Sequence, residues 1–146
     1  DATLFLARLA EGGTASFEAT RLATGNRNAN RLELNGTRGS VRFDFERMNE
    51  LEWWDDTLPP RLRGWSRIMC TDPDHPWAGA YWPSAHLIGY EHGFTSMAAD
   101  VVRVLTGQKP VLPVPDFDDA FRTQCVLHAA LVSARERRWV KPAEFA

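Results

Sequence analysis

Two stretches of the chain alternate charged and apolar residues, and this alternation limits the fold more than any other feature. In "RLEL", from Arg31, and in "SVRFDFE", from Ser40, every second side chain is apolar and most of the others are charged. Side chains of a β-strand point alternately to the two faces of a sheet, so the pattern predicts strands with one apolar face. Residues Gly36–Gly39 join the stretches, which predicts an antiparallel hairpin.

Further strands are expected on both sides of this hairpin. The runs "TLFLARLA" and "TASFEATRLATG" flank Gly12–Gly13, and a glycine pair between β-like runs is typical of a tight turn. The runs "LEWWDD" (residues 51–56) and "GWSRIMC" (residues 64–70) predict two more strands. The short spacing between all these runs indicates an antiparallel meander.

The last third of the chain predicts two helices. Apolar residues follow helical spacing from Phe94, and Gly107 is expected to end that helix. Asp116 is expected to cap a second helix that runs to about Arg137. Residues 137–142, "RRWVKP", are expected to form a short final strand.

Strands followed by helices predict an α+β fold. The expected architecture is a largely antiparallel open sheet with the two C-terminal helices packed on one face. The Trp and Phe content of the sheet indicates that a partner chain covers its other face, so a homodimer or higher homo-oligomer is expected through the sheet.

Composition narrows the class of protein. The 146 residues carry a formal net charge of -2 and no basic run, which argues against nucleic acid or an anionic membrane as a partner. No apolar run approaches membrane-spanning length. The two cysteines, Cys70 and Cys125, form no CxxC pair, which favours reduced thiols and a cytoplasmic protein. The chain starts within an apparent strand and without Met, so we expect a piece of a longer chain.

The segment "TDPDHPWAGAYWPSAHLIGYEHGF", from Thr71, is the candidate site. It is rich in proline, has no periodicity and is long for a structureless loop, which favours a function. Amphipathic rings pack against the apolar faces of sugars, while Tyr and His polar atoms bind hydroxyl groups. This chemistry predicts Trp82, His86, Tyr90 and His92 as substrate-binding residues. The alternative is that the aromatic side chains only clamp the loop onto the sheet.

Other kinds of chemistry receive less support. The sequence has no GxGxxG fingerprint, phosphate-binding loop, nucleophile elbow or HExxH motif. The spacing of His75, His86 and His92 matches no compact zinc pattern, so no metal site is expected. A cofactor-free acid–base enzyme that uses His86 or His92 with Glu91 remains an alternative.

Three parts of the chain resemble a known family. They are "ASFEATRLATGNRNANRLELNGTRGSVRFDFERMNELEWW", "HPWAGAYWPSAHLIGYEHGF" and "FDDAFRTQCVLHAALVSARERRWV". They resemble successive parts of the C-terminal domain of the glucose–fructose oxidoreductase / inositol dehydrogenase / rhizopine-catabolism family. The resemblance covers nearly the whole chain, so residues 1–146 are expected to form one partial C-terminal domain, for substrate binding and dimerisation.

The resemblance implies an enzyme whose chemistry lies outside this chain. In the family, an N-terminal Rossmann domain, absent from this sequence, binds NAD or NADP, and the catalytic residues belong upstream. The implied reaction passes a hydride between nicotinamide and a CH–OH carbon of a sugar, polyol or inositol-like substrate. The present chain is therefore expected to bind no cofactor and to be inactive alone. A stand-alone small-sugar-binding or dimerisation module without catalysis is the alternative.

Overall fold

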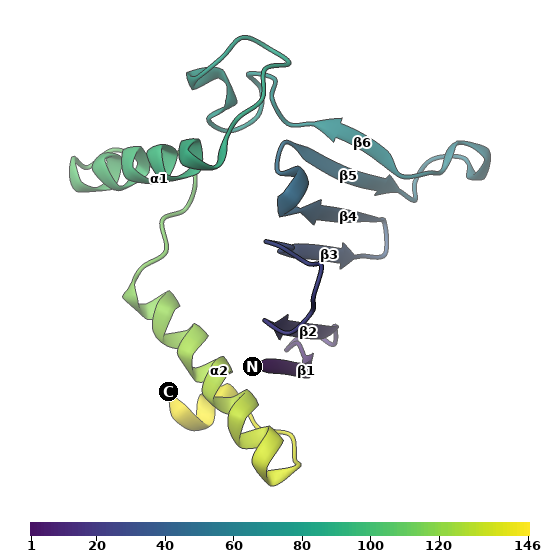
Figure 1. The fold of residues 1–146 in the computed structure, drawn as a ribbon, viewed down its shortest axis with the longest axis vertical. Helices are drawn as coiled ribbons and strands as arrows, with labels where there is room; N and C mark the ends of the chain where they lie inside the picture. The colour runs from purple at the N-terminus through teal and green to yellow at the C-terminus, as the bar shows by residue number, and fades with distance from the viewer. The chain divides into compact units, whose positions relative to one another are not determined.

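The computed structural model describes residues 1–146, which divide into two compact units (Figure 1). One unit contains residues 1–25 and 115–146, and the other contains residues 26–114. The chain has the α+β composition that the sequence predicts, with two antiparallel sheets and two α-helices. No helix combines the length and the apolar character that a membrane span requires.

The first unit begins with a β-hairpin. Strand β1 (Ala2–Arg8) pairs antiparallel with strand β2 (Thr14–Thr20). Gly12 adopts a φ of 94° in the turn, a conformation that costs glycine little because it has no Cβ. Phe5 stacks on its cross-strand partner Phe17, with 4.7 Å between the ring centroids. The glycine-turn prediction is confirmed.

Helix α2 (Phe117–Glu136) belongs to the same unit. The Asp116 carboxylate accepts a hydrogen bond of 2.8 Å from the Asp119 backbone N–H, as expected of an N-cap. Cys125 and Ala129 are the buried residues of the helix. Both predicted ends of this helix are confirmed.

The short final strand predicted over residues 137–142 is wrong. Arg137 ends α2 in the left-handed conformation, and Pro142–Phe145 form a 3-10 helix, η4. The side chain of Arg138 binds the carboxylates of Glu136 and Glu144, which folds the tail back on itself. The Arg8 guanidinium at the end of β1 lies 4.5 Å from the centre of the Trp139 ring, but the segment forms no backbone pairing with β1, which pairs only with β2.

The second unit contains a four-stranded antiparallel meander in the order β3-β4-β5-β6. Its strands are β3 (Arg31–Asn35), β4 (Gly39–Asp44), β5 (Glu50–Asp55) and β6 (Ser66–Met69). All four strands were predicted, and so was their connectivity. The antiparallel strands form two sheets, one of two strands and one of four, and residues 21–30 between β2 and β3 contain no strand.

The register of this meander separates an apolar face from a charged one. Leu32 lies opposite Phe43, and Leu34 lies opposite Val41, as the alternation requires. The residues between them point to the other face, where Glu33, Arg42, Glu52 and Arg67 occupy one row across the four strands. On the apolar face Leu32, Leu34 and Trp53 remain between 42% and 56% exposed.

Helix α1 (Tyr90–Leu105) follows the sheet in this unit and begins at Tyr90 rather than at Phe94 as predicted. The reason is a cap that the spacing of apolar residues does not reveal. The backbone N–H of Gly89 donates to Nδ1 of His92 at 3.0 Å, which satisfies a free donor at the helix start. At the other end Gly107 has a φ of 73°, which confirms the predicted stop.

Candidate functional site

The segment between β6 and α1 is held to the helix by a tryptophan. It forms turns and the short 3-10 helix η3 (Ala78–Ala80). The Trp77 indole N–H donates to the Asp100 carboxylate on α1 at 3.0 Å, and the Arg103 guanidinium lies 5.6 Å from the centre of the indole ring. Trp77 has a φ of 65°, which a bulky residue adopts only when its surroundings hold it there.

Asp100 is the buried acceptor at the centre of this arrangement, with 3% of its surface exposed. Besides Trp77, it accepts hydrogen bonds from the backbone N–H groups of Val111, at 2.6 Å, and Leu112, at 3.2 Å. Burial alone would raise the pKa of Asp100, but these donors and Arg103 together hold it below its ordinary value. One carboxylate therefore joins the loop, the helix and the connector that follows it.

Tyr81 makes a second attachment between loop and helix. Its hydroxyl donates to the His92 carbonyl at 2.9 Å and lies 2.7 Å from the Ser96 hydroxyl. Its ring meets the His92 ring edge to face, with centroids 4.4 Å apart. Trp77 and Tyr81 thus clamp the loop, as the structural alternative anticipated, but they clamp it onto α1 rather than onto the sheet.

Two of the four predicted substrate-binding residues lie together. The ring of Trp82 lies 6.4 Å from that of His92, and Trp82 is 51% exposed. The Nδ1 atom of His92 already accepts the Gly89 N–H, so its Nε2 is the ring nitrogen left for a ligand. This pair offers an indole surface beside a single polar atom.

The other two predicted residues lie apart from that pair. Tyr90 packs edge to face against Phe45 and Phe94, at centroid distances of 5.6 and 5.0 Å. The Nδ1 atom of His86 lies 3.1 Å from the Pro83 carbonyl, within its own turn. No hydrogen bond or ring contact joins either side chain to Trp82 or His92. The roles of all four residues in substrate binding stay predictions.

Glu91 and His92 do not form a proton relay in this structure. The Glu91 carboxylate lies 3.3 Å from Nδ1 of His92. That nitrogen accepts the Gly89 N–H, so it carries no proton of its own to donate to the carboxylate. The His92–Glu91 form of the acid–base alternative therefore lacks the hydrogen bond on which such a pair depends, and the His86 ring contacts the Pro83 and Ser84 carbonyls rather than Glu91.

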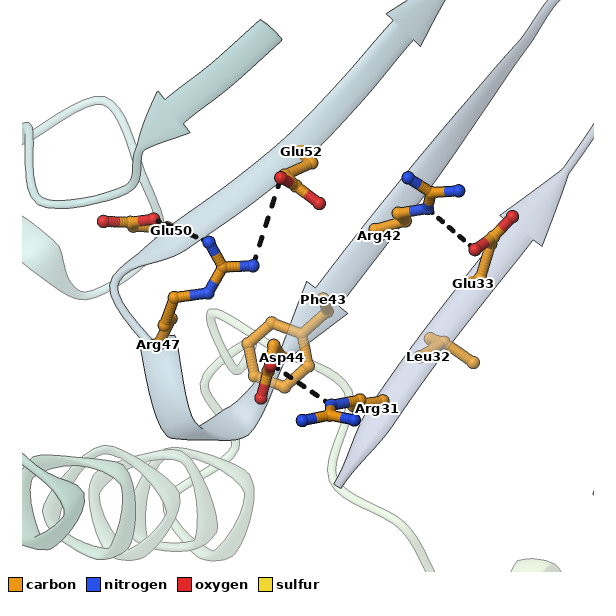
Figure 2. Close-up of a pocket in the computed structure, with 9 residues that line it drawn as sticks. All are labelled: Arg31, Leu32, Glu33, Arg42, Phe43, Asp44, Arg47, Glu50 and Glu52. Atoms are coloured by element: carbon orange, nitrogen blue, oxygen red, sulfur yellow. Dashed lines mark hydrogen bonds and ion pairs between the residues drawn. The ribbon is translucent and has the colours of Figure 1, made fainter. Parts of the chain in front are cut away.

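A cavity of about 410 Å³ opens on the charged face of the meander. Figure 2 shows side chains from β3, β4, β5 and the turn between β4 and β5 around it. Its lining consists of Arg31, Leu32, Glu33, Arg42, Phe43, Asp44, Arg47, Glu50 and Glu52. The sequence interpretation named none of these residues as a site, although their alternation with apolar residues placed the charged ones on one face.

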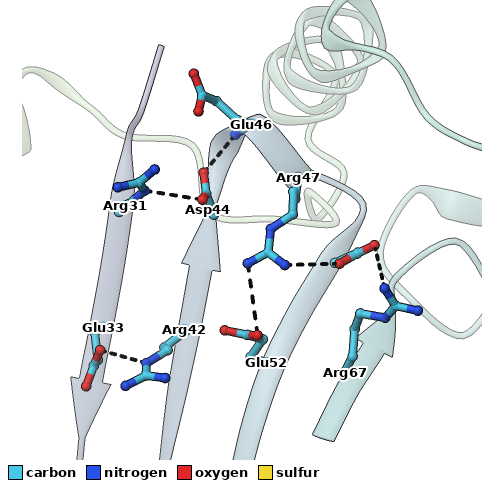
Figure 3. A network of polar contacts seen from close by, with 9 residues as sticks. Arg31, Glu33, Arg42, Asp44, Glu46, Arg47, Glu52 and Arg67 are labelled. Carbon is cyan, nitrogen blue, oxygen red and sulfur yellow. Dashed lines mark hydrogen bonds and ion pairs between the residues drawn. The ribbon is translucent and has the colours of Figure 1, made fainter. Parts of the chain in front are cut away.

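Two close ion pairs cross from β3 to β4 in this cavity. The Nε of Arg31 lies 3.2 Å from an Asp44 oxygen, and the Nε of Arg42 lies 2.7 Å from a Glu33 oxygen (Figure 3). Hydrogen bonds from Arg42 and Asn35 lower the pKa of Glu33. All these carboxylates are partly exposed, so the pairs contribute little to stability.

Arg47 makes looser contacts. It projects from the 3-10 helix η1 (Phe45–Arg47), and its terminal nitrogens lie 3.8 Å from Glu50 and 4.0 Å from Glu52. These distances exceed those of hydrogen bonds. Oxygen Oε2 of Glu50 is buried and has no hydrogen-bond partner. The lining holds three arginines and four carboxylates, and hydrogen-bonding atoms of Arg47 and Glu50 remain without a hydrogen-bond partner.

The residues present do not fit a nucleotide cofactor. Nucleotide phosphates bind at glycine-rich turns between a strand and a helix. Here Gly12–Gly13 and Gly36–Gly39 both lie in β-hairpins. No three His, Cys, Asp or Glu side chains gather as metal ligands would. Cys70 and Cys125 are free thiols, and burial raises the pKa of Cys70.

Comparison with known proteins identifies relatives over almost the whole chain. Levoglucosan dehydrogenase of Pseudarthrobacter phenanthrenivorans is 33% identical over 141 residues, which cover 96% of this chain and 35% of that protein. No protein-family model matches the chain. The chain thus spans about a third of the length of this relative.

Solved structures have the same fold. An oxidoreductase domain protein from Kribbella flavida is 45% identical, with a TM-score of 0.89 over 96% of this chain and 36% of that one. Levoglucosan dehydrogenase in complex with NADH and L-sorbose is 33% identical, with a TM-score of 0.81 over 92% of this chain and 36% of that one. The chain matches the C-terminal domain of such oxidoreductases, and its homologues are oxidoreductases of the glucose–fructose oxidoreductase / inositol dehydrogenase / rhizopine-catabolism type.

Proposed function

We propose that the chain is the C-terminal, substrate-binding part of an NAD(P)-dependent oxidoreductase that acts on CH–OH groups of a sugar, polyol or inositol-like molecule. The observation that carries the proposal is the similarity to levoglucosan dehydrogenase, which extends over 96% of the chain. A structure of that enzyme in complex with NADH and levoglucosan is 31% identical to the chain, with a TM-score of 0.80 over 92% of it.

In this proposal Trp82 and His92 contribute part of the substrate-facing wall. The exposed indole would pack against the apolar face of a sugar ring, and Nε2 of His92 would bond to a hydroxyl group. The exposed polar atoms of His86 and Tyr90 would contact more distant parts of the substrate. The groups that transfer the proton and hydride, and those that bind NAD or NADP, would lie outside this chain.

The proposal includes a homo-oligomer and a cytoplasmic setting. Leu32, Leu34 and Trp53 leave apolar area exposed on the meander, and a second copy that covered this face would bury it. Light scattering of the purified protein would measure the oligomeric state, and a monomer at micromolar concentration would contradict this part. Free Cys70 and Cys125 suit a reducing compartment.

The decisive experiment restores the natural upstream sequence. The longer protein and the present chain would be incubated with NAD or NADP and a panel of levoglucosan, sorbose and inositol, and nicotinamide absorbance would be followed. Turnover by the longer protein alone is the expected result. If neither protein bound nucleotide, the dehydrogenase proposal would fail and a stand-alone sugar-binding or dimerisation module would replace it.

A further inference from the structure

The charged face of the meander carries more hydrogen-bonding capacity than the chain itself uses. Arg31 and Arg42 each bond to a carboxylate through Nε alone, so their terminal nitrogens make no hydrogen bond within the chain. Arg47 makes none at all, since its nearest carboxylate oxygens lie at 3.8 and 4.0 Å. A guanidinium group offers five N–H donors, so unused donors of three side chains line one cavity.

Unused acceptors lie beside these donors. Oxygen Oε2 of Glu50 is shielded from solvent and has no hydrogen-bond partner, and Glu52 contacts Arg47 only at ion-pair distance. The shielded Glu50 oxygen faces Arg47 at 3.8 Å, whereas the Glu52 side chain is 30% exposed and can be reached from solvent. A hydroxyl group can donate to Glu50 or Glu52 and accept from Arg47 at the same time.

The mixture of positive and negative groups on this face favours a neutral ligand. Four arginines and four carboxylates share this face. Figure 3 labels Arg31, Arg42, Arg47, Arg67, Glu33, Asp44 and Glu52, and Glu50 pairs with Arg47 and Arg67. All of them except Arg67 line the cavity. An anion would meet the carboxylates and a cation would meet the guanidinium groups, so neither gains from the site as a whole. A molecule with many hydroxyl groups meets donors and acceptors in alternation.

The dimensions also suit a small molecule. The cavity of about 410 Å³ lies within the range of ligand pockets, roughly 300–1,000 Å³. Donor and acceptor side chains alternate from strand to strand along the row that holds Glu33, Arg42 and Glu52. Neighbouring strands are about 4.8 Å apart, so one ring with several hydroxyl groups can reach side chains of two strands.

We propose that this cavity binds a neutral polyhydroxylated molecule, a sugar or polyol, through Arg47, Glu50 and Glu52 with the terminal nitrogens of Arg31 and Arg42. The site is separate from the loop that contains Trp82, and the proposal does not depend on the dehydrogenase function. The alternative is that these residues are ordinary surface ion pairs in contact with water, which would bind no sugar or polyol. A binding measurement therefore distinguishes the two possibilities.

The test is a titration of the isotopically labelled 146-residue chain with levoglucosan, glucose or inositol, followed by two-dimensional NMR. Saturable shifts of the arginine Nε–H signals and of β3–β5 amides are expected for at least one probe. Arg47→Gln and Glu52→Gln should each weaken binding about tenfold, since each removes a charged hydrogen-bond partner. Arg61→Gln is the matched control, because Arg61 lies in the same unit, in the 3-10 helix η2 (Pro60–Leu62), outside the cavity.

Several results would overturn the proposal. Absence of saturable shifts with every probe would leave an ordinary solvated face. Tighter binding of inorganic phosphate or glycine betaine than of any sugar would indicate a charged ligand instead. Shifts that follow protein concentration rather than probe would mean that a second copy covers this face. Equal weakening by Arg61→Gln, with unchanged amide dispersion in all variants, would place the binding elsewhere.

Discussion

The indole N–H of Trp77 donates to the carboxylate of Asp100 at 3.0 Å, and this bond fastens the candidate loop to helix α1. Trp77 holds a left-handed backbone conformation there, and Asp100 is buried. The left-handed backbone of Trp77 and the burial of the Asp100 carboxylate each destabilise the folded state unless other contacts offset them. The compensation is the set of three hydrogen bonds that Asp100 accepts, one from Trp77 in the loop and two from Val111 and Leu112 in the connector.

Trp77→Phe should lower stability, because it removes the indole N–H but keeps an aromatic ring in place. The expected result is a lower midpoint of urea unfolding and faster amide hydrogen exchange in the loop. Trp82→Phe is the matched control, since the Trp82 indole makes no hydrogen bond and is 51% exposed. If both variants unfolded at the same urea concentration as the unsubstituted chain, the bond would contribute nothing to stability.

Asp100 should make stability depend on pH in the acid range. Its pKa is lower in the folded chain than its ordinary value of 3.8. A carboxylate of this kind stabilises the folded state above its unfolded pKa, and the contribution disappears as pH falls through the folded pKa. The gap in urea midpoint between the unsubstituted chain and Asp100→Asn should therefore be widest near neutral pH and should narrow below pH 3.8.

The control for this titration is Asp74→Asn, which changes an exposed carboxylate that makes no hydrogen bond. Its urea midpoint should follow that of the unsubstituted chain at every pH. A difference in urea midpoint between the unsubstituted chain and Asp100→Asn that stayed constant from neutral to acid pH would contradict the lowered pKa of Asp100. The variant would then differ in packing alone.

Gly39→Ala should destabilise the meander by about 1–3 kcal/mol, the usual cost of forcing an extra methyl group into packed structure. A Cβ at Gly39 would lie 2.5 Å from the backbone carbonyl oxygen of Trp54 on β5, which cannot move without disturbing the strand pairing. Gly64→Ala is the control, since a Cβ at Gly64 meets nothing within 4 Å. Thermal unfolding of the two variants measures the difference, and equal stability would contradict the clash.

Asp116→Ala should destabilise helix α2 by about 1 kcal/mol, because it removes the acceptor for the Asp119 N–H. Asp118→Ala removes a charge from the same helical turn without removing the cap, so its effect should be smaller. Circular dichroism during urea unfolding would compare the variants. The cap would be unimportant if the two substitutions cost the same.

Trp82→Ala, made in the longer protein, should raise KM for the sugar about three- to tenfold and change kcat less, if the indole packs against the substrate. Leu87→Ala is a suitable control, because Leu87 belongs to the same loop and is 67% exposed. Steady-state kinetics of both variants would measure KM and kcat. Unchanged KM for Trp82→Ala would remove this residue from the proposed site.

Much of the secondary structure could be read from local patterns. The charged–apolar alternation around Gly36–Gly39 and the glycine pair at residues 12–13 predicted both hairpins. Two predictions were wrong, those of the final strand and of the start of α1. The segment 137–142 has strand-like residues but forms no backbone pairing with a strand, and α1 begins early because the His92 ring caps it. Pairing partners and ring orientations are not visible in a linear pattern.

The candidate site was only partly predictable. The composition of the loop after Thr71 marked it as unusual, and in the structure the rings of Trp82 and His92 lie 6.4 Å apart. The sequence could not show that Tyr81 and Trp77 are occupied in holding the loop, or that Tyr90 turns toward Phe45. Those orientations follow from contacts between residues that are distant in sequence.

The sequence by itself determined the strand and helix types, the two faces of the meander and the resemblance to an oxidoreductase family. These follow from periodicity, turn residues and motifs, which act over a few neighbouring positions. Only the tertiary structure decided that Asp100 collects three donors and that Glu50 retains a buried oxygen without a hydrogen-bond partner. Hydrogen bonds and burial depend on which distant segments meet, and the order of residues does not specify that directly.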